Sequence, residues 1–169
     1  IDLLESIETG DVAPIEYINP TKYTQHNLSV ADGLEGFGKL LEQLPPKSAK
    51  VKVKRAFEDK EYIFTHTEYN FFGPKIGFDI FRFEENKIVE HWDNLQEIQP
   101  LNPSGHSMID GYTEIEDIEK TENNKSFVKQ FVEDILINSL MDKITTYFNG
   151  DEYIQHNPNI PDNLSGLGK

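Results

Sequence analysis

Hydrophobic residues at helical spacing predict two short helical segments at the start of the chain. Leu3, Leu4 and Ile7 fall on one face of a helix over residues 2–8. A Thr-Gly-Asp sequence then interrupts the pattern, and residues 12–18 predict a second short helical or turn segment.

A longer helix is predicted over residues 33–44. Apolar residues recur along one of its faces at Leu34, Phe37, Leu40, Leu41 and Leu44. Asp32 and Glu35 have the spacing of a capping box, with Asp in place of Ser or Thr. Two prolines at positions 45 and 46 should end this helix, because proline cannot continue it.

Strand-like segments separated by polar turns follow, and they predict an antiparallel meander. They cover residues 51–57, 62–71, 75–83 and 87–98. In the first segment, alternation predicts one face made of Val51, Val53, Arg55 and Phe57. The third segment is apolar on both faces, as expected for a strand that is covered on both sides. Helices followed by such a meander predict an α+β fold, in which the helices pack on one face of a curved sheet.

The chain then begins to repeat itself. Tyr17–Lys39 and Tyr147–Lys169 align without a gap, and 11 of the 23 positions are identical. A period this long indicates a duplicated domain rather than a solenoid repeat. We therefore expect one nearly whole domain over residues 1–109, an acidic linker over 110–123, and the incomplete start of a second copy over 124–169.

Helical periodicity over residues 127–148 leads into the second copy of the motif. Without a sheet, this fragment would expose an apolar helix face, and burying one large apolar side chain is worth roughly 1.5–3 kcal/mol. We expect the fragment to pack on something. It is either the start of a complete second domain or a set of helices that docks on another chain.

Composition excludes several classes of function. The net charge of −14 disfavours nucleic acids and anionic membrane surfaces as partners, because phosphate binding needs a basic surface. The chain has no cysteine, so it has no disulfide and no thiolate metal site, and this fits a cytoplasmic protein. No apolar run approaches the ~20 residues of a membrane span.

The strongest candidate for chemistry is the His91-Trp92-Asp93 sequence in the last predicted strand. Alternation places His91 and Asp93 on one face, roughly 7 Å apart, and Trp92 on the other. A carboxylate buried among apolar neighbours can serve as a general base near neutral pH. The alternative is an Asp at a strand end that is exposed to water.

Two other histidines are weaker candidates. Residues 23–27 (Tyr-x-Gln-His-Asn) recur at 153–157, so this motif is more than a coincidence of composition. Either its side chains bond the backbone ahead of the helix, or His26 faces a cavity and donates to a substrate oxygen. His66, in the middle of a predicted strand, is more typical of a partly buried core position than of a catalyst.

No cofactor is expected. His26, His66, His91 and Asp93 could together mimic a metal site of histidines and a carboxylate, but their spacing lacks any compact ligand motif. The chain has no Gly-rich phosphate loop and no serine nucleophile elbow. We therefore predict neither a metal nor an organic cofactor.

Four segments, in this order and at these separations, resemble the SnoaL-like polyketide cyclase family. They are Tyr-x-Gln-His-Asn at 23–27, ADGLEGF at 31–37, DIFRF at 79–83 and KIVEHWD at 87–93. The family belongs to the nuclear transport factor 2-like superfamily, which also holds ketosteroid isomerase. The resemblance covers residues 1–108 and resumes over 124–169. It implies an α+β cone, which is a strongly bent antiparallel sheet around a pocket closed by N-terminal helices, and it implies a homodimer.

The resemblance also implies a chemistry and a set of site residues. In the polyketide cyclases of this family, an intramolecular aldol condensation proceeds without metal or cofactor. The acid/base residue carried across is Asp93, with His26 and either His91 or His66 as hydrogen-bond donors to the developing enolate. The expected wall of the pocket consists of Tyr23, Phe37, Phe64, His66 and Phe81.

These expectations leave two functional hypotheses. The first is a cofactor-free enzyme that acts on a small hydrophobic or carbonyl compound through Asp93. The second is a non-catalytic module, for ligand binding or for protein assembly, that keeps the cone without the activity. Both remain open because this fold hosts many functions. The two hypotheses differ in whether Asp93 lies in a closed apolar pocket.

Overall fold

The computed structural model describes residues 1–44 and 48–167. It divides into two compact units, Ile1–Ile98 and Gln99–Lys169, and each is described here by itself. Residues 99–109, which the predicted division assigns to the first domain, thus belong to the second compact unit. The prolines predicted to end the helix, at positions 45 and 46, lie outside the described residues.

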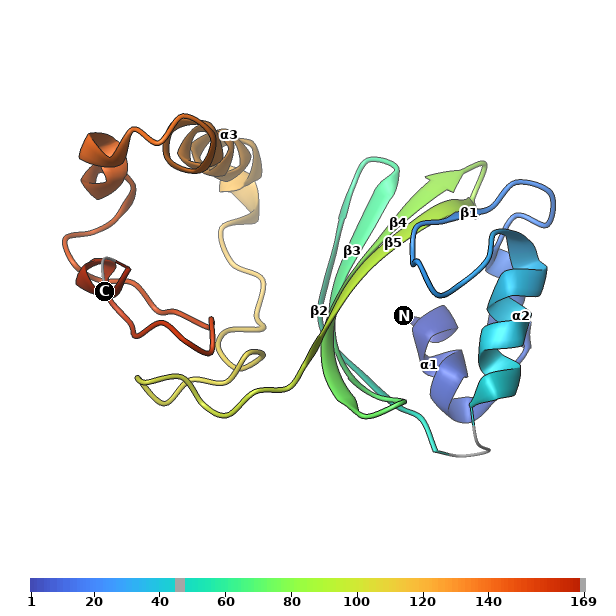
Figure 1. Ribbon diagram of the computed structural model, residues 1–169. Helices are drawn as coiled ribbons and strands as arrows, with labels where there is room; N and C mark the ends of the chain where they lie inside the picture. Colours follow the sequence, from blue (N-terminus) through green and yellow to red (C-terminus); the bar gives the residue numbers. More distant parts are fainter. Residues whose placement is uncertain (45–47, 168–169) are drawn as a thin grey trace. The chain divides into compact units, whose positions relative to one another are not determined.

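The first unit is built on a five-stranded sheet with the order β1-β5-β4-β3-β2. Its strands are β1 (Thr24–Gln25), β2 (Lys50–Asp59), β3 (Tyr62–Asn70), β4 (Pro74–Glu84) and β5 (Lys87–Glu97). The last four form the predicted antiparallel meander, and the short β1 pairs with β5 in parallel. The sheet curves around the helices on its concave side (Figure 1), which is the predicted α+β arrangement.

Three helical segments cover the concave face of the sheet. They are α1 (Asp2–Thr9), η1 (Ala13–Tyr17) and α2 (Gly33–Gln43). The first helix ends at Gly10, whose left-handed backbone (φ 73°) lets its N–H bond to the carbonyl of Ser6. The core between helices and sheet contains Leu3, Leu4, Ile18, Tyr23, Phe37, Val51, Tyr69, Phe81 and Ile88.

The predicted capping box at the start of α2 does not form. Asp32 makes no side-chain capping bond, and its Oδ1 instead accepts the backbone N–H of Gln25 at 2.7 Å. Glu35 pairs with Lys39 one turn along the helix. The aspartate therefore ties the preceding loop to the helix start rather than capping the helix.

A β-bulge between Val53 and Arg55 overturns the predicted face of β2. Before the bulge, Val53 pairs with Thr67; after it, Phe57 pairs with Phe64, which points to the opposite side of β3. One extra residue reverses the alternation of side chains. Arg55 and Phe57 consequently lie on the convex face of the sheet, and Phe57 is 58% exposed.

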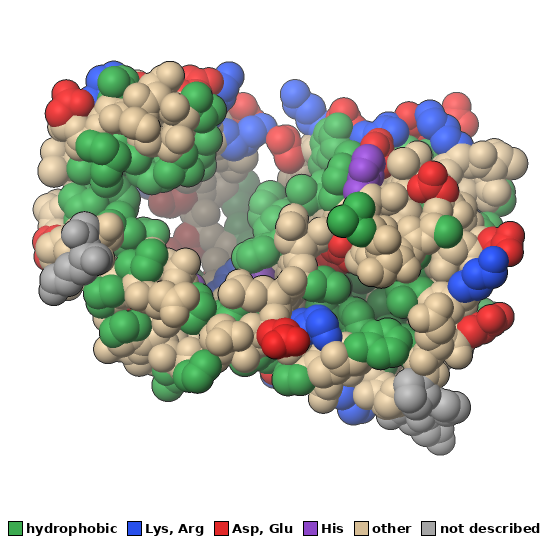
Figure 2. Space-filling model, in the orientation of Figure 1, with side chains coloured by type: hydrophobic (Ala, Val, Ile, Leu, Met, Phe, Trp, Pro, Cys, Tyr) green, Lys and Arg blue, Asp and Glu red, His purple; other side chains and the backbone are tan. Residues whose placement is uncertain are grey.

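The second unit is helical. It comprises η2 (Ile118–Lys120), α3 (Thr121–Phe131), the π-helix η3 (Val132–Ile137), η4 (Met141–Tyr147) and η5 (Leu164–Gly166). The helical periodicity over 127–148 thus corresponds to several short helices, and α3 begins inside the predicted acidic linker. Several apolar side chains of the second unit are exposed, among them Leu136 and Ile137. Figure 2 shows hydrophobic side chains on the surface of this unit.

Within residues 1–44 and 48–167, no helix is both long enough and apolar enough to cross a membrane.

Candidate active site

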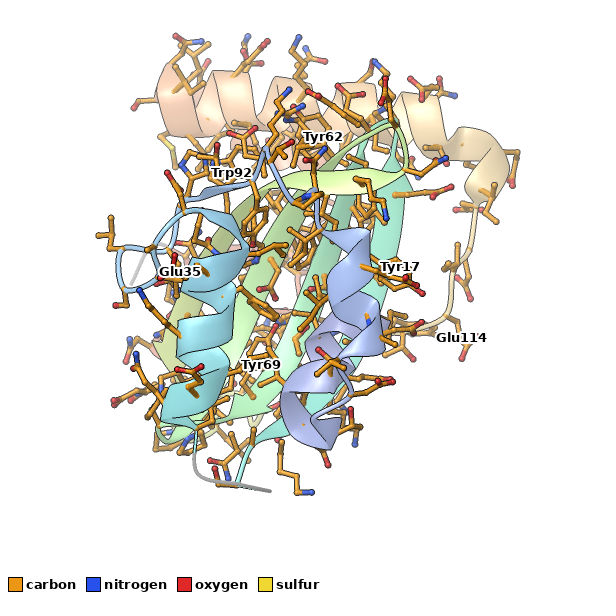
Figure 3. The ribbon with its side chains drawn as sticks, turned by 90° about the vertical axis from the view of Figure 1, so that its right-hand side faces the viewer. Tyr17, Glu35, Tyr62, Tyr69, Trp92 and Glu114 are labelled. Atoms are coloured by element: carbon orange, nitrogen blue, oxygen red, sulfur yellow. The ribbon has the colours of Figure 1, made fainter. Side chains whose placement is uncertain are left out.

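A cavity of about 260 Å³ lies between the helices and the concave face of the sheet. Leu3, Leu4 and Phe37 line it from the helical side. In Figure 3 the two helices stand in front of the sheet, and Tyr69 is labelled on the sheet between them. The polar groups that line this mostly apolar hollow are Tyr23, Gln25, Asn27, Ser29, Gln43, Tyr69, Lys75, Asp79, His91 and Asp93. A few convergent polar groups in an apolar pocket are typical of a binding or active site.

The alternation predicted for β5 is confirmed. His91 and Asp93 both line the cavity, whereas Trp92 stacks on His26 outside it, with ring centroids 4.7 Å apart. Tyr62 also contacts Trp92. The sequence therefore placed the two titratable groups of the His-Trp-Asp motif on the correct face.

Asp79 is the residue that the sequence interpretation missed. It is 2% exposed on β4, directly opposite Asp93 on β5. Its Oδ2 accepts the hydroxyl of Tyr69 at 2.7 Å and that of Thr65 at 3.1 Å, and its Oδ1 lies 3.3 Å from Nε2 of His91. Burial of a carboxylate costs free energy unless hydrogen bonds satisfy both of its oxygens. Both oxygens of Asp79 have such partners.

The hydrogen bonds around Gln25 fix the position of one proton on His91. Oε1 of Gln25 accepts the backbone N–H of Asn27 at 3.0 Å, so this atom must be the oxygen. The same oxygen lies 3.1 Å from Nδ1 of His91, which must then carry a proton. A second proton lies between Nε2 of His91 and Asp79, because otherwise two acceptors would face each other.

A similar argument fixes the amide of Asn27 beside Asp93. Oδ1 of Asn27 accepts the backbone N–H of Ser29 at 2.8 Å, so its Nδ2 is the atom that faces Asp93. Nδ2 donates to Oδ2 of Asp93 at 2.6 Å. This bond holds the carboxylate of Asp93 at the cavity wall.

The hydroxyl of Tyr23 has a donor proton directed to no partner within residues 1–44 and 48–167. Its oxygen accepts Nε2 of Gln25 at 3.2 Å. Burial, followed by the nearby charges of Asp93 and Asp79, raises the pKa of Tyr23 well above that of an ordinary tyrosine. The phenol therefore stays protonated and can donate to a ligand oxygen in the cavity.

The prediction that His26 faces the cavity is wrong. Besides stacking on Trp92, its Nε2 lies 2.9 Å from Oε1 of Glu90, and its side chain is 40% exposed. Hydrogen bonds from His26 and then Arg82 lower the pKa of Glu90. The backbone N–H of His26 donates to the carbonyl of His91 as part of the sheet.

Two predicted wall residues also lie elsewhere. Phe64 and His66 both stack on Phe78 at the convex face of the sheet, because alternate residues of β3 point away from the helices. His66 also contacts Arg55, with 3.3 Å between ring and guanidinium nitrogens. Tyr23 and Phe37, together with Phe81, do line the cavity.

The Tyr-x-Gln-His-Asn motif forms the same local structure in both units. In each, the side-chain amide of the Gln donates to the Tyr hydroxyl, and the Gln oxygen accepts the N–H two residues on. The backbone N–H of Gln25 bonds to Asp32, and that of Gln155 bonds to Asp162. These bonds form without a strand such as β5, so they favour a structural role for much of the motif.

Of the described residues, Asp79, His91 and Asp93 form the cluster in this unit that could hold a metal ion, with ligand atoms within 4.8 Å of one another. Both oxygens of Asp79 already face protein hydrogen-bond partners. The arrangement therefore suits proton transfer in a hydrogen-bonded network better than metal coordination.

No protein-family model and no curated protein matches the chain. Several solved structures are similar to it. A nuclear transport factor 2-like protein of unknown function from Burkholderia xenovorans has 18% identity, covering 60% of this chain and 81% of its own (TM-score 0.49). TsrD from Streptomyces laurentii has 16% identity, covering 56% and 82% (TM-score 0.47). A putative polyketide cyclase from Bacillus cereus has 13% identity, covering 56% and 69% (TM-score 0.47). Nuclear transport factor 2-like proteins and putative polyketide cyclases are thus among the solved structures to which this chain is similar.

Proposed function

We propose that the first unit is a cofactor-free enzyme for acid–base chemistry, of the aldol-cyclisation or isomerisation type, on a small carbonyl compound. The observation that carries this proposal is the position of Asp93, whose carboxylate lines an apolar cavity and is held there by Asn27. A general base needs such a fixed place beside the reacting carbon.

The proposed reaction begins with loss of a proton next to a carbonyl. The carboxylate of Asp93 takes this proton, and the C–H electron pair forms an enolate whose charge develops on oxygen. The hydroxyl of Tyr23 donates a hydrogen bond to that oxygen, which lowers the barrier. In an isomerisation the proton returns at another carbon. In an aldol reaction the enolate carbon forms a C–C bond to a second carbonyl carbon, whose oxygen then takes the proton.

His91 acts in this proposal through its fixed position in the cavity wall. Its ring is stacked on Phe81 with centroids 4.5 Å apart, and it is held between Gln25 and Asp79. The contact between Nε2 of His91 and Asp79 fixes the orientation of the ring beside Asp93. The role of His26 as an enolate donor is not part of the proposal.

The test uses small cyclic ketones in D₂O, with α-proton exchange followed by NMR. The enzyme should exchange α-protons faster than buffer, and Asp93→Asn should exchange at the buffer rate. Asp11→Asn is the matched control, because it changes an exposed carboxylate outside the cavity. Binding of 2-naphthol, whose oxygen mimics an enolate, should persist in Asp93→Asn.

The alternative, a module that binds ligands without catalysis, gives a different result. It predicts 2-naphthol binding by the unmodified protein with no α-proton exchange above buffer. Equal exchange by the unmodified protein and Asp93→Asn would refute the base role of Asp93. The predicted homodimer stays a prediction, which the mass in solution would test.

A further inference from the structure

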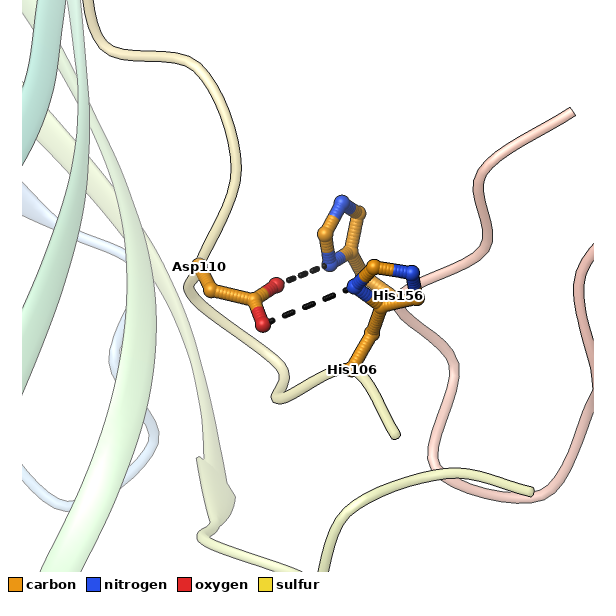
Figure 4. Close-up of side chains that lie close together, drawn as sticks. All are labelled: His106, Asp110 and His156. Carbon is orange, nitrogen blue, oxygen red and sulfur yellow. Dashed lines mark ion pairs between the residues drawn. The ribbon is translucent and has the colours of Figure 1, made fainter. Parts of the chain in front are cut away.

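A second cluster of titratable side chains lies in the helical unit, and the proposed enzyme does not use it. His106, Asp110 and His156 offer ligand atoms that all lie within 4.8 Å of one another. His106 and Asp110 stand four residues apart on one loop, and His156 comes from the second Tyr-x-Gln-His-Asn motif. Figure 4 shows both imidazole rings presenting a nitrogen to the same carboxylate.

We propose that His106, Asp110 and His156 bind a divalent transition-metal ion of the zinc type. Two imidazoles and one carboxylate are the ligand set that such ions prefer. Nothing in this proposal depends on the activity of the first unit.

The ligand atoms lie about as far apart as neighbouring ligands of a bound ion. Nδ1 of His156 lies 2.8 Å from Oδ1 of Asp110, and Nδ1 of His106 lies 3.6 Å from Oδ2 of Asp110. Metal bonds of about 2.0 Å place neighbouring tetrahedral ligands roughly 3.3 Å apart, between these two values. His106 and Asp110 form an ion pair at the longer of these distances, and a bound ion would replace this direct contact.

The outer ring nitrogen of His106 has the partner that a metal-bound histidine needs. Its Nε2 lies 3.1 Å from Oδ2 of Asp162, while Oδ1 of Asp162 accepts the backbone N–H of Gln155. A carboxylate at this position holds the proton on Nε2 and leaves Nδ1 free to bind an ion. Asp162 is therefore a positioning residue for the proposed site.

The cluster also has backbone contacts, and its side chains lie partly open to solvent. Nδ1 of His156 also lies 2.9 Å from the carbonyl of Ser107, and Oδ2 of Asp110 accepts the N–H of Ser107. The three ligand side chains are 32–42% exposed. A fourth ligand can thus be water. Metal binding would replace the proton on Nδ1 of His156 and release it.

The test titrates the full chain, without a histidine tag, with Co²⁺ as an optical probe. We expect one ion per chain with the intense visible absorption of four-coordinate cobalt, displaced by Zn²⁺. His106→Gln and His156→Gln should each weaken binding tenfold or more, and Asp162→Asn should weaken it less than either. Circular dichroism checks that each variant is folded.

Two matched controls separate this site from others. His26→Gln changes the equivalent position of the first motif, and Asp93→Asn changes the other cluster that could hold a metal. Both should bind cobalt as the unmodified protein does. Loss of binding in Asp93→Asn, unchanged binding in His156→Gln, or no cobalt binding at all would overturn the proposal.

Discussion

Asp79 and Asp93 occupy directly opposed positions on β4 and β5, but their carboxylates have different hydrogen-bond partners. Asp79 is buried under Tyr69, Thr65 and His91, whereas Asp93 faces the cavity and accepts a hydrogen bond from Asn27. The difference in partners is what separates a structural carboxylate from a candidate base.

Replacement of Asp79 should therefore affect stability in a graded way. In Asp79→Asn, the amide oxygen can still accept from Tyr69 and Thr65, and its NH₂ can donate to a neutral His91. In Asp79→Ala these groups lose their partner, which costs about 1–3 kcal/mol for each buried group left unpaired. In urea unfolding, Asp79→Ala should lower the free energy of unfolding far more than Asp79→Asn does. Equal losses would contradict the network described here.

Gly36 is required by a close backbone approach rather than by its own conformation. A Cβ at this position would lie 1.8 Å from the carbonyl oxygen of Ala31. Gly36→Ala should destabilise the first unit by about 1–3 kcal/mol or more, as overpacking does. Gly38→Ala is the matched control on the same helix, because nothing lies within 4 Å of its Cβ. Thermal unfolding would measure both, and similar losses in the two variants would argue against this contact.

The stability of the protein should fall at alkaline pH because of its buried tyrosines. Burial, followed by the charge of Asp79, raises the pKa of Tyr69 above the value of about 10 in an unfolded chain. Above that pH the unfolded chain releases this proton while the folded chain keeps it. The contribution of Tyr69 is therefore complete below about pH 10 and is lost as the pH rises further.

Urea titrations at several pH values would measure this loss. Tyr69→Phe should flatten the decline of unfolding free energy above about pH 10. Tyr112→Phe should leave it unchanged, since Tyr112 is 80% exposed. An unchanged slope in Tyr69→Phe would contradict the assignment.

Tyr23→Phe tests the hydrogen bond that the proposed reaction requires. The variant removes the donor and keeps the ring in the cavity wall, so the fold should remain. Loss of one donor to a developing enolate should slow α-proton exchange roughly 10²- to 10³-fold. Tyr62→Phe, outside the cavity, is the control. A full rate in Tyr23→Phe would remove Tyr23 from the mechanism.

Much of the fold could be predicted from simple periodicity. The two-residue alternation of β5 placed His91 and Asp93 together and Trp92 opposite, and each strand of the meander was found within a few residues. Helical spacing placed Phe37 toward the sheet. These predictions depend on short-range patterns, which the sequence contains directly.

Register could not be predicted, and this explains why Asp79 was missed. From the turn at 85–86, regular pairing would set Asp79 opposite Trp92. The register shift between Arg82 and Phe83 moves the pairing by one residue and sets it opposite Asp93. A second bulge, in β2, sent Arg55 and Phe57 to the convex face. Single-residue insertions of this kind leave no clear trace in an alternating pattern.

The misplacement of His26 has a related cause. The motif predicted a histidine that faces the cavity, and His26 does lie beside β5. The parallel pairing of Thr24 and Gln25 with that strand turns the ring to the convex side, against Trp92. Gln25 and Asn27 reach the cavity instead, and the recurrence of the motif was the available signal for them.

The most direct test of the central claim is a crystal structure of the protein with 2-naphthol. The account predicts the naphthol ring in the cavity beneath α1 and α2, its oxygen within about 2.6–3.2 Å of the Tyr23 hydroxyl, and the Asp93 carboxylate over the ring. A naphthol bound elsewhere, or an Asp93 turned out into solvent with the cavity filled by side chains, would contradict it.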